Sequence, residues 1–332
     1  MPTKLRVVVS CSDRKSLPAA PDLRLAQYPG DTLLDRSGSW INRINRPQSE
    51  TRPANALYQG AHWSVVRNLN DENPSCIGTE VELWIASAGY GLTRWDEELE
   101  SYGATFSSGH ADSVVAPGMT DDRAGATAFW WDALASRHRI DDAPPSLAEL
   151  VSGEPDSPVL VALSASYLRA VRHDLGRALR RTASPQNLFI LSTGSSSIEL
   201  GGALVPFDSR LLGTVGGSNM SLIPRTARFL VAHDDQHGWD FDEVRNFMNA
   251  QLEQQPARPS HDRDRQSDAQ VMEVIRGALA EADSRQTKRP SATTLLGLLR
   301  DSGNACEQKR FKDLYDRVSG DRESHALEGV NA

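Results

Sequence analysis

The chain has 332 residues and a formal net charge of −8. Hydrophobic residues make up 39% and charged residues 24%, which is typical of a globular protein and excludes a chain that is disordered throughout. The acidic balance argues against a uniformly basic nucleic-acid-binding surface, although it leaves room for a local basic face.

The N-terminus and the cysteines indicate the compartment. The opening residues, MPTKLRVVVS, predict a strand and not a signal peptide. No apolar run approaches the roughly 18 residues of a membrane span. Cys11, Cys76 and Cys306 lie far apart, so no disulfide framework or zinc pattern is indicated. We therefore expect a cytoplasmic protein with no membrane, metal or cofactor partner.

Four short apolar runs, rich in β-branched residues, predict the strands of a sheet. Nearly continuous apolar runs are typical of strands covered on both faces. The predicted strands are Arg6–Ser10, Val81–Ser87, Val159–Ser164 and Leu188–Ser192. The segments with helical spacing that separate them are Asn55–Asn70, Arg123–Arg139 and Tyr167–Arg181. This alternation predicts an α/β fold, with three α/β/α layers around a central, mostly parallel four-stranded sheet.

All four predicted strands end in small polar residues, which read SCS, SAG, SAS and STGSSS. Because ligands of open α/β sheets bind beyond the carboxyl ends of the strands, these tips predict one shared polar crevice. Leu17–Pro53, after the first tip, is rich in Pro, Arg and Asp and is interpreted as a long loop or insertion. Later in the chain, a Gly-rich loop at Pro206–Ser221 precedes a predicted helix, Ile223–His233.

A polar, Pro-containing stretch divides the chain. We expect an α/β domain over residues 1–253, a linker over 254–267 and a helical region over 268–332. The predicted helices of that region are Asp268–Ala282, Ser291–Asp301 and Ala305–Val318. The last two, joined by a Gly turn, resemble a helix-turn-helix. Residues 285–312 hold seven Lys or Arg and two acidic residues, a net charge of +5. This predicts a module that contacts phosphates, and the alternative is a solvated helical hairpin.

The first strand tip carries the most varied chemistry. Residues 10–15 bring together a thiol, hydroxyls, a carboxylate and two cations. Asp13 is suited to orienting a water molecule or stabilising a cationic transition state. Arg14 and Lys15, with nearby backbone N–H groups, suit an anion. The alternative is a strand-to-loop turn with solvated charges.

A thiol and an aromatic ring are further candidates. Cys11 would act as a nucleophile only beside a base, and His62 could supply that base if the fold brings it close. Tyr90 stands between two glycines after the tip that begins at Ser87, so its ring could present a face to a nucleobase. The alternative is a turn with a packed tyrosine.

The later loops offer phosphate contacts. Ser195 and Ser196 follow the fourth strand, and Asn219 precedes Arg225 in a Gly-rich stretch. The fourth tip lacks the Lys of a P-loop, which argues against hydrolysis of nucleoside triphosphates. The cluster at His233–His237 matches no strong zinc spacing, so a solvated loop is favoured there over a metal site.

Three motifs carry a resemblance to a known family. They are SCSDRK at the first tip, ALYQGAHW in the next helix, and SAGYGL…ESY at and beyond the second strand. They resemble a family of bacterial domains that is similar to the uracil-DNA-glycosylase-like domain of archaeosine synthases. The resemblance covers roughly residues 4–235. It carries over Cys11, Ser12 and Lys15, and more loosely His62. Ser10 departs from the family's Pro, and a long insertion follows the first tip.

The resemblance implies a nucleobase flipped into the crevice and held by stacking and edge hydrogen bonds. Cleavage would pass through an oxocarbenium-like state helped by a carboxylate and a positioned water, with the carboxylate just after the first tip, where Asp13 stands. The insertion at 17–53 suggests room for a bulky modified base. Some members of this wider group look like anti-phage DNA glycosylases that excise glucosylated hydroxymethylcytosine.

We therefore expect a DNA glycosylase that excises a modified base in anti-phage defence. The catalytic candidates are Asp13, Ser12 and Lys15. The base-binding candidates are Cys11, Ser87, Tyr90, Tyr58 and His62. The DNA-binding candidates are Arg14, Ser195, Ser196, Asn219, Arg225, Arg300, Lys309 and Arg310. Two alternatives remain: a transferase or lyase acting on a base of tRNA or DNA, with Cys11, Ser12 and Lys15 central, and a nucleic-acid sensor without catalysis.

Overall fold

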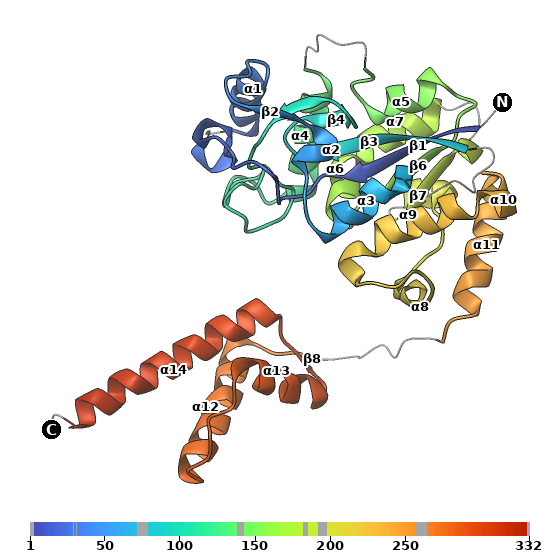
Figure 1. Cartoon of the computed structure of the whole chain (residues 1–332). Coiled ribbons are helices and arrows are strands. Elements are labelled where there is room, and N and C mark those ends of the chain that lie inside the picture. The colour runs from blue at the N-terminus through green and yellow to red at the C-terminus, as the bar shows by residue number, and fades with distance from the viewer. Residues whose placement is uncertain are drawn as a thin grey trace. The chain divides into compact units, whose positions relative to one another are not determined.

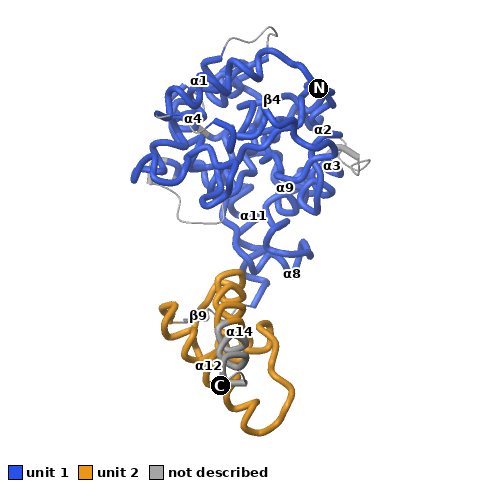
Figure 2. The backbone as a smooth tube through the Cα atoms, turned by 90° about the vertical axis from the view of Figure 1, so that its left-hand side faces the viewer, with its two compact units in different colours: residues 1–257 blue, residues 258–332 orange. Residues whose placement is uncertain are grey.

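The computed structural model describes residues 3–28, 30, 32–71, 79–137, 143–181, 185–191, 198–256 and 264–330. The chain forms two compact units, residues 1–257 and 258–332 (Figure 2). The division falls inside the stretch 254–267 that the sequence suggested as a linker. Each unit is described by itself below.

A five-stranded mixed sheet forms the centre of the first unit (Figure 1). Its strands are β1 (Thr3–Ser10), β3 (Thr79–Ser87), β4 (Gly91–Arg94), β6 (Val159–Ala162) and β7 (Leu188–Leu191). Their order across the sheet is β4-β3-β1-β6-β7. The pairs β3–β1, β1–β6 and β6–β7 are parallel, whereas β4 pairs with β3 in antiparallel register. The α/β class is confirmed, and the expected four-stranded, mostly parallel sheet is wrong, because the chain after β3 reverses and adds a fifth strand.

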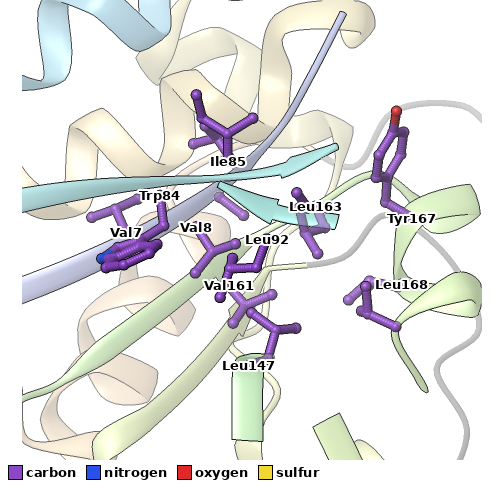
Figure 3. Packing of buried hydrophobic residues seen from close by; sticks show 14 of the residues in the cluster. Val7, Val8, Trp84, Ile85, Leu92, Leu147, Val161, Leu163, Tyr167 and Leu168 are labelled. Carbon is purple, nitrogen blue, oxygen red and sulfur yellow. The ribbon is translucent and has the colours of Figure 1, made fainter. Parts of the chain in front are cut away.

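Helices pack on both sides of this sheet. On one side, α3 (Ala61–Asp71) packs against α9 (Leu222–Ala232), near α8 (Leu212–Val215). On the other side, four helices pack on one another: α4 (Arg123–Ala135), α5 (Leu147–Gly153), α6 (Ala165–Ala170) and α7 (Arg172–Arg181). The short α10 (Asp234–His237) precedes α11 (Phe241–Glu253), which closes the unit. Figure 3 shows aliphatic side chains from β1 and β6 meeting Leu147, with the hydroxyl of Tyr167 pointing away from this core.

One of the predicted helices is interrupted. The segment expected as Asn55–Asn70 forms α2 (Ala54–Leu57) and α3, with a break at Gly60, where φ is +108°. A left-handed φ is easily adopted by glycine and ends a helix. The break leaves Tyr58 in extended backbone between the two helices, where it forms a bridge with Lys15.

The segment 17–53 is more ordered than the expected loop. It contains α1 (Leu33–Ile44) and β2 (Thr51–Pro53), which pairs with β5 (Glu98–Glu100). Leu23 and Leu25 exchange backbone hydrogen bonds with Gly103, at 2.7 and 2.9 Å. The indole of Trp40 donates to the carbonyl of Gly89 at 2.7 Å. The described part of the segment 17–53 therefore packs against the residues that follow β3.

The second unit has a small core of its own. Its helices are α12 (Asp268–Ser284), α13 (Ala292–Asp301) and α14 (Gln308–Val330), with a short ladder between β8 (Asp264–Arg265) and β9 (Asn304–Ala305). Ser267 and Ser291 cap the first two helices through their hydroxyls. Gly303, with a φ of +81°, turns the chain between α13 and α14. The buried core residues are Val271, Ile275, Leu279, Leu295, Leu296, Leu299, Cys306, Phe311, Leu314 and Val318. Across both units, none of the described helices is long and apolar enough to cross a membrane.

Candidate functional site

The strand order creates a switch point beside β1. The chain passes from β1 to β3 on one side of it and then returns to β6 on the other side. In such sheets the crossovers diverge, and ligands bind in the crevice at the carboxyl ends of the two strands. Here the tips of β1 and β6 touch, because the backbone N–H of Ser164 lies 3.3 Å from the Oγ of Ser10.

A group of buried thiol and hydroxyl side chains lies at this point. We call it the hydroxyl–thiol cluster, and it consists of Cys11, Tyr58, Ser87, Tyr102 and Tyr167. The Sγ of Cys11 lies 2.9 Å from the Oη of Tyr167 and 3.4 Å from that of Tyr102. The Oη of Tyr102 also lies 2.7 Å from the Oγ of Ser87 and 3.0 Å from the Oη of Tyr58. The cluster therefore links the tips of β1 and β3 to the helix after β6.

Burial keeps the tyrosines of this cluster protonated. It raises the pKa of Tyr58, Tyr102 and Tyr167 well above the ordinary value, because a phenolate would lose its hydration. The three hydroxyls therefore remain neutral hydrogen-bond donors around neutral pH. Such donors suit the polar edge of a nucleobase or a developing negative charge on a leaving group.

The amine of Lys15 lies over the ring of Tyr102, a member of the cluster. Its Nζ lies 4.1 Å from the ring centroid of Tyr102 and donates to the backbone carbonyls of Ser12 and Asp13, each at 3.2 Å. Burial lowers the pKa of Lys15, and the nearby Cys11 and Asp13 oppose that change. A partly desolvated amine at the end of a central strand is a frequent feature of functional sites.

Asp13 and Arg14 are exposed just beyond the carboxyl end of β1. The Asp13 carboxylate acts electrostatically on both Lys15 and Tyr167, contributing to the raised pKa of Tyr167. Ser12 accepts from the backbone N–H of Gln59 at 3.3 Å and holds the turn. The structure therefore brings together six of the candidates: Cys11, Ser12, Asp13, Lys15, Tyr58 and Ser87.

Tyr90 does not offer a stacking face. Its ring is buried and meets Tyr102 edge-on, at 5.2 Å and 75°, while the Arg137 guanidinium lies 5.7 Å from its centroid. Its hydroxyl donates to the carbonyl of Glu100 at 3.3 Å. The expectation of a platform for a base is therefore corrected: the two glycines flank a turn that directs this ring into the core.

His62 does not serve Cys11. It lies in the first turn of α3, and a backbone hydrogen bond with Ser10 opposes the burial that lowers its pKa. Its buried Nε2 has no hydrogen-bond partner among the described residues. The thiol of Cys11 contacts the hydroxyls of Tyr167 and Tyr102, and among the described residues no hydrogen bond joins it to His62.

The predicted DNA-binding residues are dispersed. Ser195 and Ser196 lie outside the described residues. Asn219 is exposed, whereas Arg225 braces its own loop through Ser221 Oγ at 3.2 Å and Val215 O at 3.3 Å. Arg14 lies beyond the tip of β1, and the other three candidates are in the second unit. There Arg300 donates to the Cys306 carbonyl, Arg310 pairs with Asp268, and Lys309 is exposed.

Sequence reasoning missed a cavity of about 450 Å³ on the far side of Tyr167. Its lining includes Phe106, Arg123, Ser166 and Arg169. The SAS at the third strand tip was a signal for it, because Ser166 belongs to that tip. The two arginines could not be assigned from sequence, since they come from different helices.

No protein-family model matches the chain, and no curated protein matches it. Among the described residues, no group of three or more His, Cys, Asp or Glu side chains is arranged to hold a metal ion.

Proposed function

We propose that the chain is a DNA glycosylase that hydrolyses the N-glycosidic bond of a modified base in anti-phage defence. The observation that carries this proposal is the exposed carboxylate of Asp13 beyond the tip of the central strand, close to the buried hydroxyl–thiol cluster. The resemblance of the SCSDRK, ALYQGAHW and SAGYGL motifs to the uracil-DNA-glycosylase-like group points to the same chemistry.

In this proposal the hydroxyls of the cluster and the carboxylate of Asp13 assist different steps of the hydrolysis. The base enters the crevice, and hydroxyls of the cluster donate to it as its bond to C1′ breaks. Asp13 orients a water molecule, stabilises the oxocarbenium-like sugar and accepts the proton that the water loses as its oxygen bonds to C1′. The base departs as its anion and, through solvent, receives the proton that Asp13 took from the water, so the products are the free base and an abasic site and Asp13 is again a carboxylate.

The test uses the full chain and DNA containing glucosylated 5-hydroxymethylcytosine, with unmodified DNA beside it. Mass spectrometry measures the released base, and cleavage of abasic sites measures the other product. Asp13→Asn is expected to lower the rate by roughly 100-fold or more, as for other general acid–base residues. Asp96→Asn, an exposed carboxylate in the β4–β5 turn, is the matched control. No released base from modified DNA, or full activity in Asp13→Asn, contradicts the proposal.

Lys15 favours a second candidate, a lyase or transferase that acts through a covalent adduct. Its lowered pKa makes the neutral amine more accessible, and neutral amines attack aldehydes to form Schiff bases. Borohydride would then trap the chain on DNA containing an abasic site, and Lys15→Gln would abolish the trapped product. Lys4→Gln, on the outer part of the same strand, is the control. A nucleoside of added mass instead of a free base would favour the transferase.

A further inference from the structure

The cavity beside Tyr167 is built for an anion. Ser107, Ser108, Thr127 and Ser166 supply hydroxyls, and Arg123 and Arg169 supply positive charge. Its volume of about 450 Å³ falls within the range of small-molecule sites. None of its lining residues is acidic.

The charge of both arginines is available to a ligand. The guanidinium of Arg123 donates to Ser113 Oγ at 2.7 Å and to the carbonyls of Ser107 and Val115, all of which are uncharged. Arg169 is exposed, and no contact with a carboxylate is found for it among the described residues. Uncharged acceptors leave a guanidinium its full charge, and guanidinium groups favour phosphate through paired hydrogen bonds.

The cavity adjoins the candidate active site through one side chain. Tyr167 contacts Cys11 through its hydroxyl, while its ring packs edge-on against Phe106, with centroids 5.0 Å apart. Phe106 lines the cavity, and Ser166 and Arg169 lie on the same short helix as Tyr167. A single side chain thus connects the hydroxyl–thiol cluster to the lining of the cavity.

We propose that this cavity binds the phosphate group of the nucleotide whose base occupies the crevice. The inference rests on the proposed function for the identity of the ligand as a nucleotide. The phosphate can belong to a free mononucleotide or to the backbone of a DNA strand, and both present the same chemistry to the two arginines.

Calorimetry on the full chain tests this without any base excision. The probes are deoxycytidine, its 5′-monophosphate and a single-stranded DNA dodecamer. We expect the monophosphate or the dodecamer to bind about tenfold or more tightly than deoxycytidine. Arg169→Gln should remove most of that difference, and Ser166→Asp, which adds a negative charge inside the cavity, should do the same. Arg180→Gln, an exposed arginine on α7, is the matched control and should keep it.

The outcomes separate the two sources and the two proposals. An effect of Arg169→Gln on both probes assigns the cavity to any nucleotide phosphate, and an effect on the dodecamer alone assigns it to an internal phosphodiester. Unchanged binding of both probes in Arg169→Gln and Ser166→Asp, or an equal loss in Arg180→Gln, overturns the inference. Phosphate-dependent binding without excision would contradict the glycosylase proposal and leave the phosphate site standing.

Discussion

The hydroxyl of Tyr102 lies 2.7 Å from the hydroxyl of Ser87, although the two residues belong to different parts of the site. Ser87 ends strand β3, and Tyr102 follows β5 after the chain has reversed twice. The pair fixes the position of Tyr102 beneath Lys15 and beside Cys11.

Replacing Tyr102 by Phe removes a buried hydroxyl that has three partners. Ser87, Tyr58 and Cys11 each lose a hydrogen bond, and a buried polar group left unpaired costs free energy. We expect the free energy of unfolding to fall by about 1–2 kcal/mol in urea denaturation. Tyr28→Phe removes a hydroxyl that contacts the Asp22 carbonyl near the surface and should cost less. Equal losses in the two variants would contradict the role given to the cluster.

Gly89 keeps the space into which Tyr102 packs. A Cβ at this position would lie 2.5 Å from carbons of the Tyr102 ring, so Gly89→Ala has to displace the ring. Overpacking of this kind destabilises by about 1–3 kcal/mol, and the displacement should also slow any reaction at the crevice. Gly153→Ala, where a Cβ meets nothing within 4 Å, is the control. Thermal unfolding together with the excision assay would detect both effects, and wild-type behaviour of Gly89→Ala would disprove the argument.

Glu100 makes the free energy of unfolding depend on pH in the acidic range. Burial opposes its ionisation, but Arg43, Ser49 and the backbone N–H groups of Gln48 and Ser49 lower its pKa to about 2. A carboxyl with a lowered pKa stabilises the fold fully above its unfolded pKa of roughly 4.3, and this contribution is lost as the pH falls toward 2.

We therefore expect Glu100→Gln to cost about 3 kcal/mol at pH 7, because the buried Arg43 guanidinium loses its buried carboxylate partner and keeps only the half-exposed Asp22. The difference from the wild type should narrow between pH 5 and pH 2, as measured by chemical denaturation across that interval. Glu50→Gln, which removes an exposed partner of Arg52, should change stability by less than about 0.5 kcal/mol. A gap that stays constant with pH would show that the charge of Glu100 is not what stabilises the fold.

Lys309 tests whether the second unit contacts nucleic acid. It is exposed at the start of α14, whereas Arg310 is tied to Asp268 and its loss would disturb the fold of the unit. If Lys309 contacts a phosphate, Lys309→Gln should weaken DNA binding and lower the slope of log K against log salt by about one. Arg317→Gln, on an exposed part of the same helix, should leave the slope unchanged. The same slope in Lys309→Gln and the wild type would remove the reason to place DNA at this turn.

Most of the sheet could be predicted because its strands are buried on both faces. Val7, Val8 and Val9 are fully buried, and such runs are recognisable without any partner. Strand β4 was missed because Gly91–Arg94 is short and mixed in character, and its pairing with β3 depends on the turn at Gly89. Local propensity does not reveal where a chain reverses when the turn is closed by tertiary contacts.

The sequence allowed us to predict which site residues lie together at one strand tip. It did not reveal which residues from different tips and helices come into contact. Cys11, Ser12, Asp13 and Lys15 stand together in the sequence, so their proximity needed no fold. Tyr102 and Tyr167 are in the cluster only because the sheet and the packing of α6 bring them there. The prediction that Tyr90 stacks on a base was wrong for the same reason, because the direction of its ring depends on its packing against Tyr102 and Arg137.

The packing of the segment 17–53 against residues that follow it in sequence affects how the chain folds during its synthesis. Leu23 and Leu25 pair with Gly103, about 80 residues downstream, so their partner has not been made when they leave the ribosome. At roughly 5–20 residues per second, the wait lasts several seconds. During this interval Leu23, Leu25 and Trp40, all fully buried in the finished fold, lack their partners from beyond β3, namely Gly103, Gly89 and Tyr102. The nascent chain thus passes through an interval in which these apolar side chains can promote aggregation.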